Sequence, residues 1–335
     1  MILTLKTLSF SLVTALTVII IILLCLYLSK HWQQPKYPVV IAVSKTPLST
    51  PFYVAKAINA FDDTCVNVEF DEVVGGQRAF AKVLNGEVDF GTSSDSLIAF
   101  KSLEGQPFVT HAMFVQSDND VKFISRASAN FESALDLKGQ RIGVTKGTAS
   151  EYFLSTLLAL EGLTTEDVRV YYYEPEQLVN GFIAQDIDAF IPWEPFGFYS
   201  DQLLSGIIKI HDTKSLNTLS FNLISPTANN LVVEKAKCVI QGLDLAIDYI
   251  TSHPLESKAI VMNELNISTE FIEWVWPDYI FKLGLNQSLI HSVESQANWA
   301  VATQMSQYDN VPHIERFIDS RAMLQIIPNA VNIPQ

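Results

Sequence analysis

The chain has 335 residues, of which 48% are hydrophobic and 17% charged. This composition excludes a disordered protein, and the length provides for about two domains. Its 36 Asp and Glu residues outnumber its 22 Lys and Arg residues, for a net charge of −14. Nucleic acid is therefore excluded as a partner, because phosphate backbones attract basic surfaces.

The first predicted element is an uncharged apolar segment, residues 8–28. At about 1.5 Å per residue it forms a helix of about 31 Å, the thickness of the hydrocarbon core of a bilayer. A cleaved signal peptide has a shorter apolar stretch and small residues at its end, whereas residues 26–28 are Leu, Tyr and Leu. We favour an uncleaved membrane anchor over a cleaved leader. Lys6 and Lys30 flank the segment on opposite sides and leave its orientation open.

Strand-like and helix-like stretches alternate from residue 39 onward. The run VVIAV has the continuous apolar pattern of a buried strand, and Gly75 and Gly76 mark a turn before the second helix. The predicted elements up to residue 115 are strands at 39–43, 66–74, 88–91 and 108–115 and helices at 52–61 and 77–84.

The same alternation resumes after about residue 121. Gly162 stands where a left-handed cap belongs at the end of a helix with one apolar face. The predicted elements are strands at 141–144, 168–173 and 189–193, helices at 152–160 and 177–184, and a mainly helical last hundred residues that begin with a helix at 238–250. This alternation predicts an α/β architecture.

Two cysteines, Cys65 and Cys238, lie outside the apolar segment. In an oxidising compartment such a pair can form a disulfide bond. The alternative is two buried free thiols that behave as small apolar side chains. The sequence leaves both readings open.

The sequence shows no recognisable catalytic set. Its six histidines are scattered, without a pair four residues apart and without Cys or acidic residues at metal-ligand spacing. There is no G-x-S-x-G motif, and residues 143–148, GVTKGT, lack the spacing of a P-loop. We therefore predict a protein that is not an enzyme and that holds neither a metal nor a cofactor.

Four short polar turns are predicted to lead from a strand or turn into a helix. They are Pro47–Phe52, Gly75–Gln77, Ser93–Asp95 and Gly147–Ser150. Each turn places free backbone N–H groups and hydroxyls at a helix N-terminus, where small polar groups and anions bind. An ordinary helix cap explains any one of these turns equally well, so the hypothesis of a binding site rests on their repetition.

The segment 186–196, DIDAFIPWEPF, is a more specific candidate. Trp193 and Glu194 stand between two prolines at the end of a predicted strand. This arrangement places an aromatic ring and a carboxylate at a rigid edge that could form the wall of a ligand cleft. The alternative is a buried tryptophan beneath a turn. Phe52 and Tyr53 could form the opposite wall, or the core face of a helix.

Three segments together resemble the substrate-binding proteins of ABC importers for nitrate, sulfonates, taurine and thiamine-pyrimidine precursors. They are residues 75–91, GGQRAFAKVLNGEVDFG, residues 136–153, DLKGQRIGVTKGTASEYF, and residues 185–195, QDIDAFIPWEP. The resemblance covers nearly the whole chain beyond the linker. It is specific for the family and not for its ligand.

The resemblance implies a two-lobed periplasmic-binding-protein fold, type II-like, that follows the predicted transmembrane helix. Residues 1–36 would be the membrane anchor and linker, 37–117 plus 222–335 the first lobe, and 118–221 the second. The implied ligand-binding residues are Ser49, Phe52, Gly76, Gln77, Ser94, Asp95, Thr148, Ser150, Trp193, Glu194 and Asn222.

The chain departs from the family in two ways. Family members are generally secreted or lipid-linked, whereas this chain carries a predicted membrane span. Asp95 and Glu194 would repel an anion unless a cation compensates, and the only arginine near the turns is Arg78. A neutral or amine-bearing solute is thus as compatible with these residues as a sulfonate or nitrate.

The sequence therefore predicts the extracytoplasmic solute-binding component of an ABC importer, anchored at the periplasmic face of the inner membrane. Its partners would be a small-molecule solute, the membrane and an ABC permease. The alternative is a membrane-anchored sensor that passes ligand occupancy to a membrane signalling protein. An enzyme of pyrimidine synthesis on the same fold would need a reactive Cys and His cluster, which the sequence lacks.

Overall fold

A computed structural model describes residues 36–129, 131–304 and 306–333. The predicted membrane anchor at 8–28 lies outside these residues. Within the described ranges, no helix combines the length and the apolar character that a membrane span needs.

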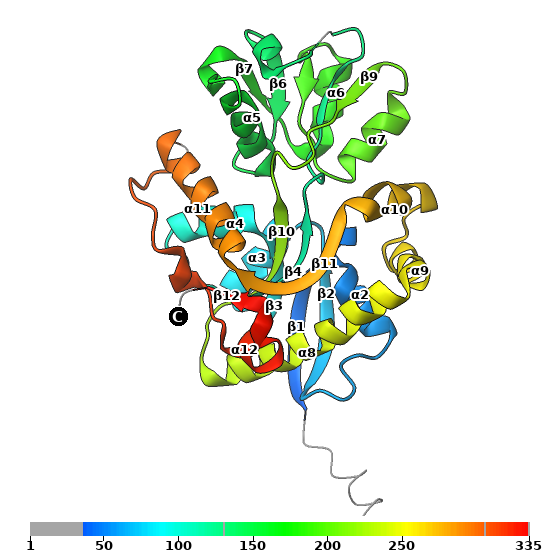
Figure 1. The fold of residues 1–335 in the computed structure, drawn as a ribbon, viewed down its shortest axis with the longest axis vertical. Coiled ribbons are helices and arrows are strands. Elements are labelled where there is room, and N and C mark those ends of the chain that lie inside the picture. The colour runs from blue at the N-terminus through cyan, green and yellow to red at the C-terminus, as the bar shows by residue number, and fades with distance from the viewer. Residues whose placement is uncertain (1–35, 130, 305, 334–335) are drawn as a thin grey trace, which may run out of the picture. The chain divides into compact units, whose positions relative to one another are not determined.

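The larger of two β-sheets has seven strands in the order β12-β11-β4-β10-β3-β1-β2 (Figure 1). β1 and β3 are parallel, and β10 runs antiparallel to both β3 and β4. Strands from both ends of the described chain thus share one sheet. The bounds are β1 (Tyr37–Ser44), β2 (Val66–Val73), β3 (Phe90–Ser94), β4 (Val109–Ser117), β10 (Leu219–Ser225), β11 (Tyr279–Asn286) and β12 (Val331–Asn332).

The helices of this part of the chain pack on the sheet or on one another. In α3, Ala79, Phe80 and Val83 are buried, and Gly91 of β3 lets this helix approach closely. A Cβ on Gly91 would lie 2.7 Å from a methyl group of Val83. The helices are α2 (Thr50–Ala57), α3 (Gly76–Leu84), α4 (Asp95–Leu103), α8 (Asn230–Ser252), α9 (Pro254–Leu265), α10 (Thr269–Val275), α11 (Gln287–Ala302) and α12 (Arg321–Ile326).

The smaller sheet has five strands in the order β7-β6-β8-β5-β9. β6 is parallel to β7 and β8, and β5 is antiparallel to β8 and β9. Its elements are β5 (Phe123–Arg126), β6 (Arg141–Val144), α5 (Ala149–Ala159), β7 (Arg169–Tyr172), α6 (Leu178–Ile183), β8 (Ala189–Phe190), α7 (Phe196–Leu203) and β9 (Ile208–His211). Short 3-10 helices occur at η1 (Pro47–Ser49), η2 (Ala134–Leu137), η3 (Thr165–Asp167), η4 (Pro175–Gln177), η5 (Trp276–Asp278), η6 (Ile314–Phe317) and η7 (Pro328–Ala330).

Two neighbouring strands connect the sheets, as Figure 1 shows for β4 and β10. They pair antiparallel from Ser117 and Leu219 at one end to Val109 and Ser225 at the other. The chain leaves the larger sheet through β4 and returns to it through β10. We call the elements around the larger sheet the first lobe and those around the smaller sheet the second lobe.

The prediction for the last hundred residues was incomplete. Those residues are largely helical, but β11 is a strand that pairs with β4 from Tyr279 opposite Ser117. Pairing with β4 is a long-range contact. Such contacts determine whether a short apolar run forms a helix or a strand when its sequence fits both equally well. The helix predicted at 238–250 is also longer than expected and begins at Asn230.

The structure joins Cys65 and Cys238 in a disulfide bond, with a Cα–Cα distance of 5.6 Å. Cys65 directly precedes β2, and Cys238 lies within α8. Of the two readings that the sequence left open, the bridge is the one present in the structure. It links chain segments 173 residues apart within the first lobe.

Candidate ligand-binding site

Three of the predicted turns of the first lobe lie at the carboxyl ends of its parallel strands. Ser49 follows β1 and is fully buried, and its hydroxyl has no hydrogen-bond partner among the described residues. Gly76 begins α3, where Gln77 is exposed. Ser94 ends β3 and caps α4 by accepting a hydrogen bond from the backbone N–H of Leu97. The topology therefore brings these turns to one edge of the sheet.

Phe52 belongs to the core of the first lobe. It is fully buried, and its ring packs edge-on against Phe114 at 5.0 Å and Phe70 at 6.0 Å between ring centroids. Phe52 therefore packs in the core of this structure, and its role as a wall of the ligand site stays a prediction. The apolar run of α2 faces the sheet, as the alternative reading of a core face predicted.

Asp95 is buried between α4 and α11, with 1% of its surface exposed. Its carboxylate accepts hydrogen bonds from the Ser292 hydroxyl at 2.7 Å and from the backbone N–H of Ser96 at 3.0 Å. Burial raises the pKa of Asp95 to about 6, although the hydrogen bond from Ser292 opposes this rise. These partners bind the carboxylate within the protein, and no pattern in the sequence indicated Ser292, which lies 197 residues away.

In the second lobe, Thr148 and Ser150 hold the turn after β6 in place. Thr148 caps α5 and donates to the carbonyl of Thr145. The Ser150 hydroxyl accepts from the N–H of Thr145 and donates to the carbonyl of Ile191, so it ties β6 to the segment after β8. Both predicted residues are therefore bound within the protein. The hydroxyl of Thr145 is buried beside them without a partner among the described residues.

Trp193 and Glu194 lie beside the connection between the lobes. Trp193 is partly exposed and forms an isolated β-bridge with Val121. Glu194 is 5% exposed and accepts a hydrogen bond at 2.6 Å from the indole N–H of Trp274, which belongs to α10 of the first lobe. A carboxylate was expected to face the ligand at this position, whereas the structure uses it to connect the lobes.

Glu194 is part of a buried group that we call the hinge cluster, which consists of Asp120, Lys122, Glu194, Asp278 and Tyr279. The ammonium of Lys122 lies 3.7 Å from Glu194 and 3.9 Å from Asp278. The Tyr279 hydroxyl donates to Asp120 at 3.0 Å. Asp278 and Tyr279 belong to the first lobe, and the other three follow β4 or β8, so the cluster joins the two lobes.

Negative charge exceeds positive charge in the hinge cluster. Burial raises the pKa of Asp120 to about 7, and repulsion by Glu194 adds to this rise. Burial also raises the pKa of Glu194, against the opposing effect of Lys122. Burial and the neighbouring Asp120 raise the pKa of Tyr279. Lys122 is therefore the cation that makes the burial of these carboxylates tolerable.

Sequence reasoning missed most of the hinge cluster. The segment 274–279, WVWPDY, is rich in aromatic and acidic residues next to a proline. This concentration of aromatic and acidic side chains could have indicated that the segment 274–279 forms a structured polar site. Its partners are 80 or more residues away in the sequence, as for Trp274 and Glu194, so their pairing required the fold.

Aromatic side chains add contacts between the lobes on two sides. Phe198 of α7 packs on Phe271 of α10 with ring centroids 5.2 Å apart. On α11, Trp299 meets Tyr152 of α5 at 5.3 Å. The indole N–H of Trp299 is buried and has no partner among the described residues. The lobes therefore contact each other directly in this structure.

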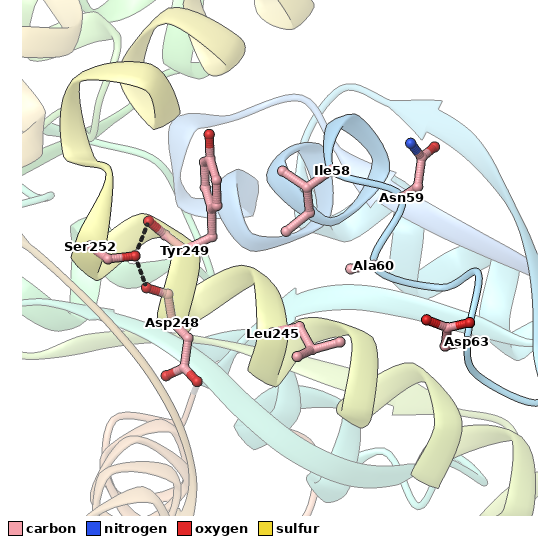
Figure 2. Close-up of a pocket in the computed structure, with 8 residues that line it drawn as sticks. All are labelled: Ile58, Asn59, Ala60, Asp63, Leu245, Asp248, Tyr249 and Ser252. Carbon is pink, nitrogen blue, oxygen red and sulfur yellow. Dashed lines mark hydrogen bonds between the residues drawn. The ribbon is translucent and has the colours of Figure 1, made fainter.

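A surface groove of about 380 Å³ lies elsewhere, between the end of α2 and α8 (Figure 2). Its lining residues are Ile58, Asn59, Ala60, Asp63, Leu245, Asp248, Tyr249 and Ser252. The dashed lines in Figure 2 show the Ser252 hydroxyl donating to two carbonyls of its own helix. This groove is at the opposite end of α2 from Ser49 and includes none of the predicted site residues.

Within the described ranges, one grouping of side chains has metal-ligand geometry, formed by Cys65, Glu234 and Cys238. Both of its sulfurs are already joined in the disulfide bond, so they are not thiolate ligands.

Comparison with known proteins agrees with this architecture. The family described as NMT1/THI5 like matches residues 46–257. The chain belongs to this family.

Its sequence is also 28% identical over 163 residues to a Brucella abortus strain 2308 protein named as a binding protein, covering 45% of this chain and 51% of that one. A match to an Escherichia coli K12 protein named as an aliphatic sulfonates-binding protein has 26% identity over 178 residues and covers 52% and 54% of the two chains. The chain spans about half the length of these curated relatives.

Solved structures show the fold over most of the described chain. The periplasmic aliphatic sulphonate binding protein of Escherichia coli superposes with a TM-score of 0.71 and 19% identity, covering 85% of this chain and 98% of that one. The alkanesulfonate-binding protein of Xanthomonas axonopodis pv. citri bound to MOPS gives a TM-score of 0.68, 19% identity and coverage of 86% and 100%. The predicted family resemblance is confirmed, and the fold is the α/β periplasmic-binding-protein fold with two sheets.

Proposed function

We propose that this protein captures a small polar solute between its two lobes and delivers it to an ABC permease. The observation that carries the proposal is a set of buried polar atoms without partners among the described residues, on elements of both lobes. Of the twelve such atoms among the described residues, four lie at or beside the predicted turns, namely the hydroxyls of Ser49, Ser93 and Thr145 and the side-chain oxygen of Asn222. Buried polar groups without partners are costly, so this set calls for a ligand or for ordered water.

The importer role is supported by what related proteins are named for. Besides the sulfonate-binding proteins, a structure described as the ligand-binding component of an ABC-type import system from Staphylococcus aureus shares the fold, with a TM-score of 0.67 and 10% identity over 86% of this chain and 98% of that one. Several of these relatives are periplasmic proteins by name. We propose the same compartment for this chain.

We further propose that the apolar segment 8–28 tethers the protein to the inner membrane. The support is its length and its lack of charged residues. A tether would keep the binding lobes at a high effective concentration near a membrane partner. Fractionation of cells that express the full chain tests this proposal. An anchored chain stays with the membranes after washing with high salt, and a chain that appears in the soluble fraction without residues 1–28 contradicts it.

Trp193→Ala is expected to weaken solute binding about tenfold or more while leaving the fold intact. Trp193 is a partly exposed ring beside the strand-end turns, and an aromatic ring of this kind contributes apolar contact area to a bound solute. The measurement is isothermal titration with ethanesulfonate, nitrate, cytosine and ethylamine, beginning with whichever raises the melting temperature in a thermal-shift screen.

Tyr171→Ala provides the matched control for Trp193. Tyr171 is a 39% exposed aromatic residue of the same lobe, on the edge strand β7. Its removal is expected to leave the dissociation constant unchanged. Equal affinity of the Trp193 variant and the unmodified protein would exclude Trp193 from the site.

A further inference from the structure

The junction of β3 and β10 holds an amide whose orientation is fixed. Asn222 stands opposite Ser93 in the antiparallel register, and both residues are fully buried. The Nδ2 of Asn222 lies 3.3 Å from the carbonyl oxygen of Ser93 and 3.4 Å from that of Ser220. A carbonyl oxygen accepts only, so the amide nitrogen must occupy this position. The Oδ1 of Asn222 is then an acceptor without a donor among the described residues.

The N-terminus of α3 meets the same junction. A Cβ on Gly76 would lie 3.5 Å from the Cα of Ser93, so the helix start lies against this strand end. Gly91 packs on α3, and Ser93 lies on the same face of β3 because side chains two residues apart point to the same side. Asn222, as the directly opposite residue, shares that face.

This junction combines donors with an acceptor. The first N–H groups of α3 have no intrahelical partner, and the N-cap Gly75 has no side chain to cap them. The Ser93 hydroxyl is buried and has no partner among the described residues. A ligand here meets N–H donors from the helix, one hydroxyl and the acceptor Oδ1 of Asn222.

We propose that the solute presents an N–H donor beside an acceptor, as a carboxamide or a lactam does, with the N–H directed to Asn222. The proposal rests on the proposed solute-binding function and adds the chemical class of the ligand. A sulfonate or a nitrate has acceptors only and leaves the Asn222 oxygen unpaired, which lowers affinity by about tenfold or more.

The test compares ligands of one shape that differ in this group. Titrations of the full chain use nicotinamide against pyridine-3-sulfonate and acetamide against methanesulfonate, with 2-pyrrolidone as a lactam. The expected result is a dissociation constant at least tenfold lower for the amide member of a pair. Tighter binding of the sulfonate members overturns the proposal and assigns the site to an anion, with Arg78 on the first turn of α3 as the nearby cation.

Two variants locate the effect at the junction. Ser93→Ala is expected to weaken the best amide ligand about fivefold without lowering the melting temperature of the free protein, because its hydroxyl forms no bond there. Thr110→Val is the matched control, since Thr110 also has a buried unpartnered hydroxyl but lies on β4 opposite Ile224 instead of Asn222. Equal losses in both variants, or no loss in either, contradict the proposal.

A separate measurement keeps this proposal distinct from the proposed function. Mass spectrometry of small molecules released when the purified protein is denatured shows whether any solute is bound. A released sulfonate or other acceptor-only solute leaves the solute-binding function intact and overturns the amide proposal alone. A panel in which no amide ligand binds also overturns it.

Discussion

Lys122→Met is expected to lower the free energy of unfolding by about 3–5 kcal/mol at pH 8. Lys122 is 4% exposed, and its ammonium lies among the carboxylates of Asp120, Glu194 and Asp278. A methionine fills a similar volume but leaves Asp120 and Glu194 without a nearby cation, whereas Asp278 keeps its ion pair with Lys214 at 2.7 Å. Breaking a buried ionic group on one side is costly because the remaining charge is desolvated and unpaired.

The free energy of unfolding that Lys122→Met loses is expected to become smaller as the pH falls from 8 to 5. The folded-state pKa of Asp120 is about 7, above its usual value of 3.8. Between these values the folded protein binds more protons than the unfolded chain, so stability decreases as the pH rises through this window. Removal of Lys122 raises the carboxylate pKa values further and makes this decrease steeper. Urea unfolding at several pH values measures the effect.

Two further variants complete this experiment. Asp120→Asn keeps an acceptor for the Tyr279 hydroxyl but removes the buried charge. We therefore expect the free energy of unfolding to rise by about 1–2 kcal/mol at pH 8, and this gain to disappear at pH 5.

Lys258→Met is the matched control for Lys122→Met. The ammonium of Lys258 lies 5.7 Å from the ring centroid of Trp276, as the ammonium of Lys122 does from that of Trp274. Lys258 pairs with an exposed Glu273, so its removal is expected to lower the free energy of unfolding by at most about 1 kcal/mol at either pH. Equal effects of the two lysine variants would contradict the role assigned to Lys122.

Much of the fold could be predicted because local patterns and long-range packing agree. The strand predicted at 141–144 is β6 within the same bounds, and Gly162 has the positive φ of 67° that its predicted cap position requires. The strand β11 was missed because its place is determined by pairing with β4, about 165 residues earlier in the chain. The spacing of apolar residues and the composition of β11 contain no information about the strand with which it pairs.

The sequence named residues for the candidate site but could not show which of them have partners within the protein. Ser49 and Asn222 do hold buried polar atoms without partners among the described residues. Asp95 and Glu194 were expected to repel an anion, yet Ser292 and Trp274 bind their carboxylates within the protein. A sequence shows which side chains can bind a ligand, whereas the fold decides which of them other side chains already occupy.

This difference changes the electrostatic expectation for the solute. Burial raises the pKa of both Asp95 and Glu194, so each carries less negative charge near neutral pH than an exposed carboxylate, and repulsion of an anion is weaker than the sequence suggested. The oxygen of Asn222, which has no partner among the described residues, is then the feature that disfavours an acceptor-only solute. In the proposed site, hydrogen-bond polarity rather than charge is expected to distinguish a sulfonate from a neutral ligand.

Removal of the Cys65–Cys238 disulfide bond is expected to cost about 2–5 kcal/mol of unfolding free energy. The bond closes a loop with a sequence separation of 173 residues, which includes the whole second lobe. Loop-closure entropy for a separation of this size favours the upper part of that range, because cross-linking distant residues restricts the unfolded chain most. Urea unfolding of the Cys65→Ala/Cys238→Ala variant measures the loss, and the unmodified protein in reductant should approach the same value.

Thiol labelling tests the premise of this prediction directly. The unmodified protein, unfolded without reductant, is expected to take up one label, at Cys25, and to take up three after reduction. A Cys25→Ser variant removes the single label and keeps the full stability, which separates the effect of the bridge from that of a cysteine substitution as such. Three labels without reductant would show that the bridge does not form. The attachment of α8 to β2 would then depend on noncovalent packing.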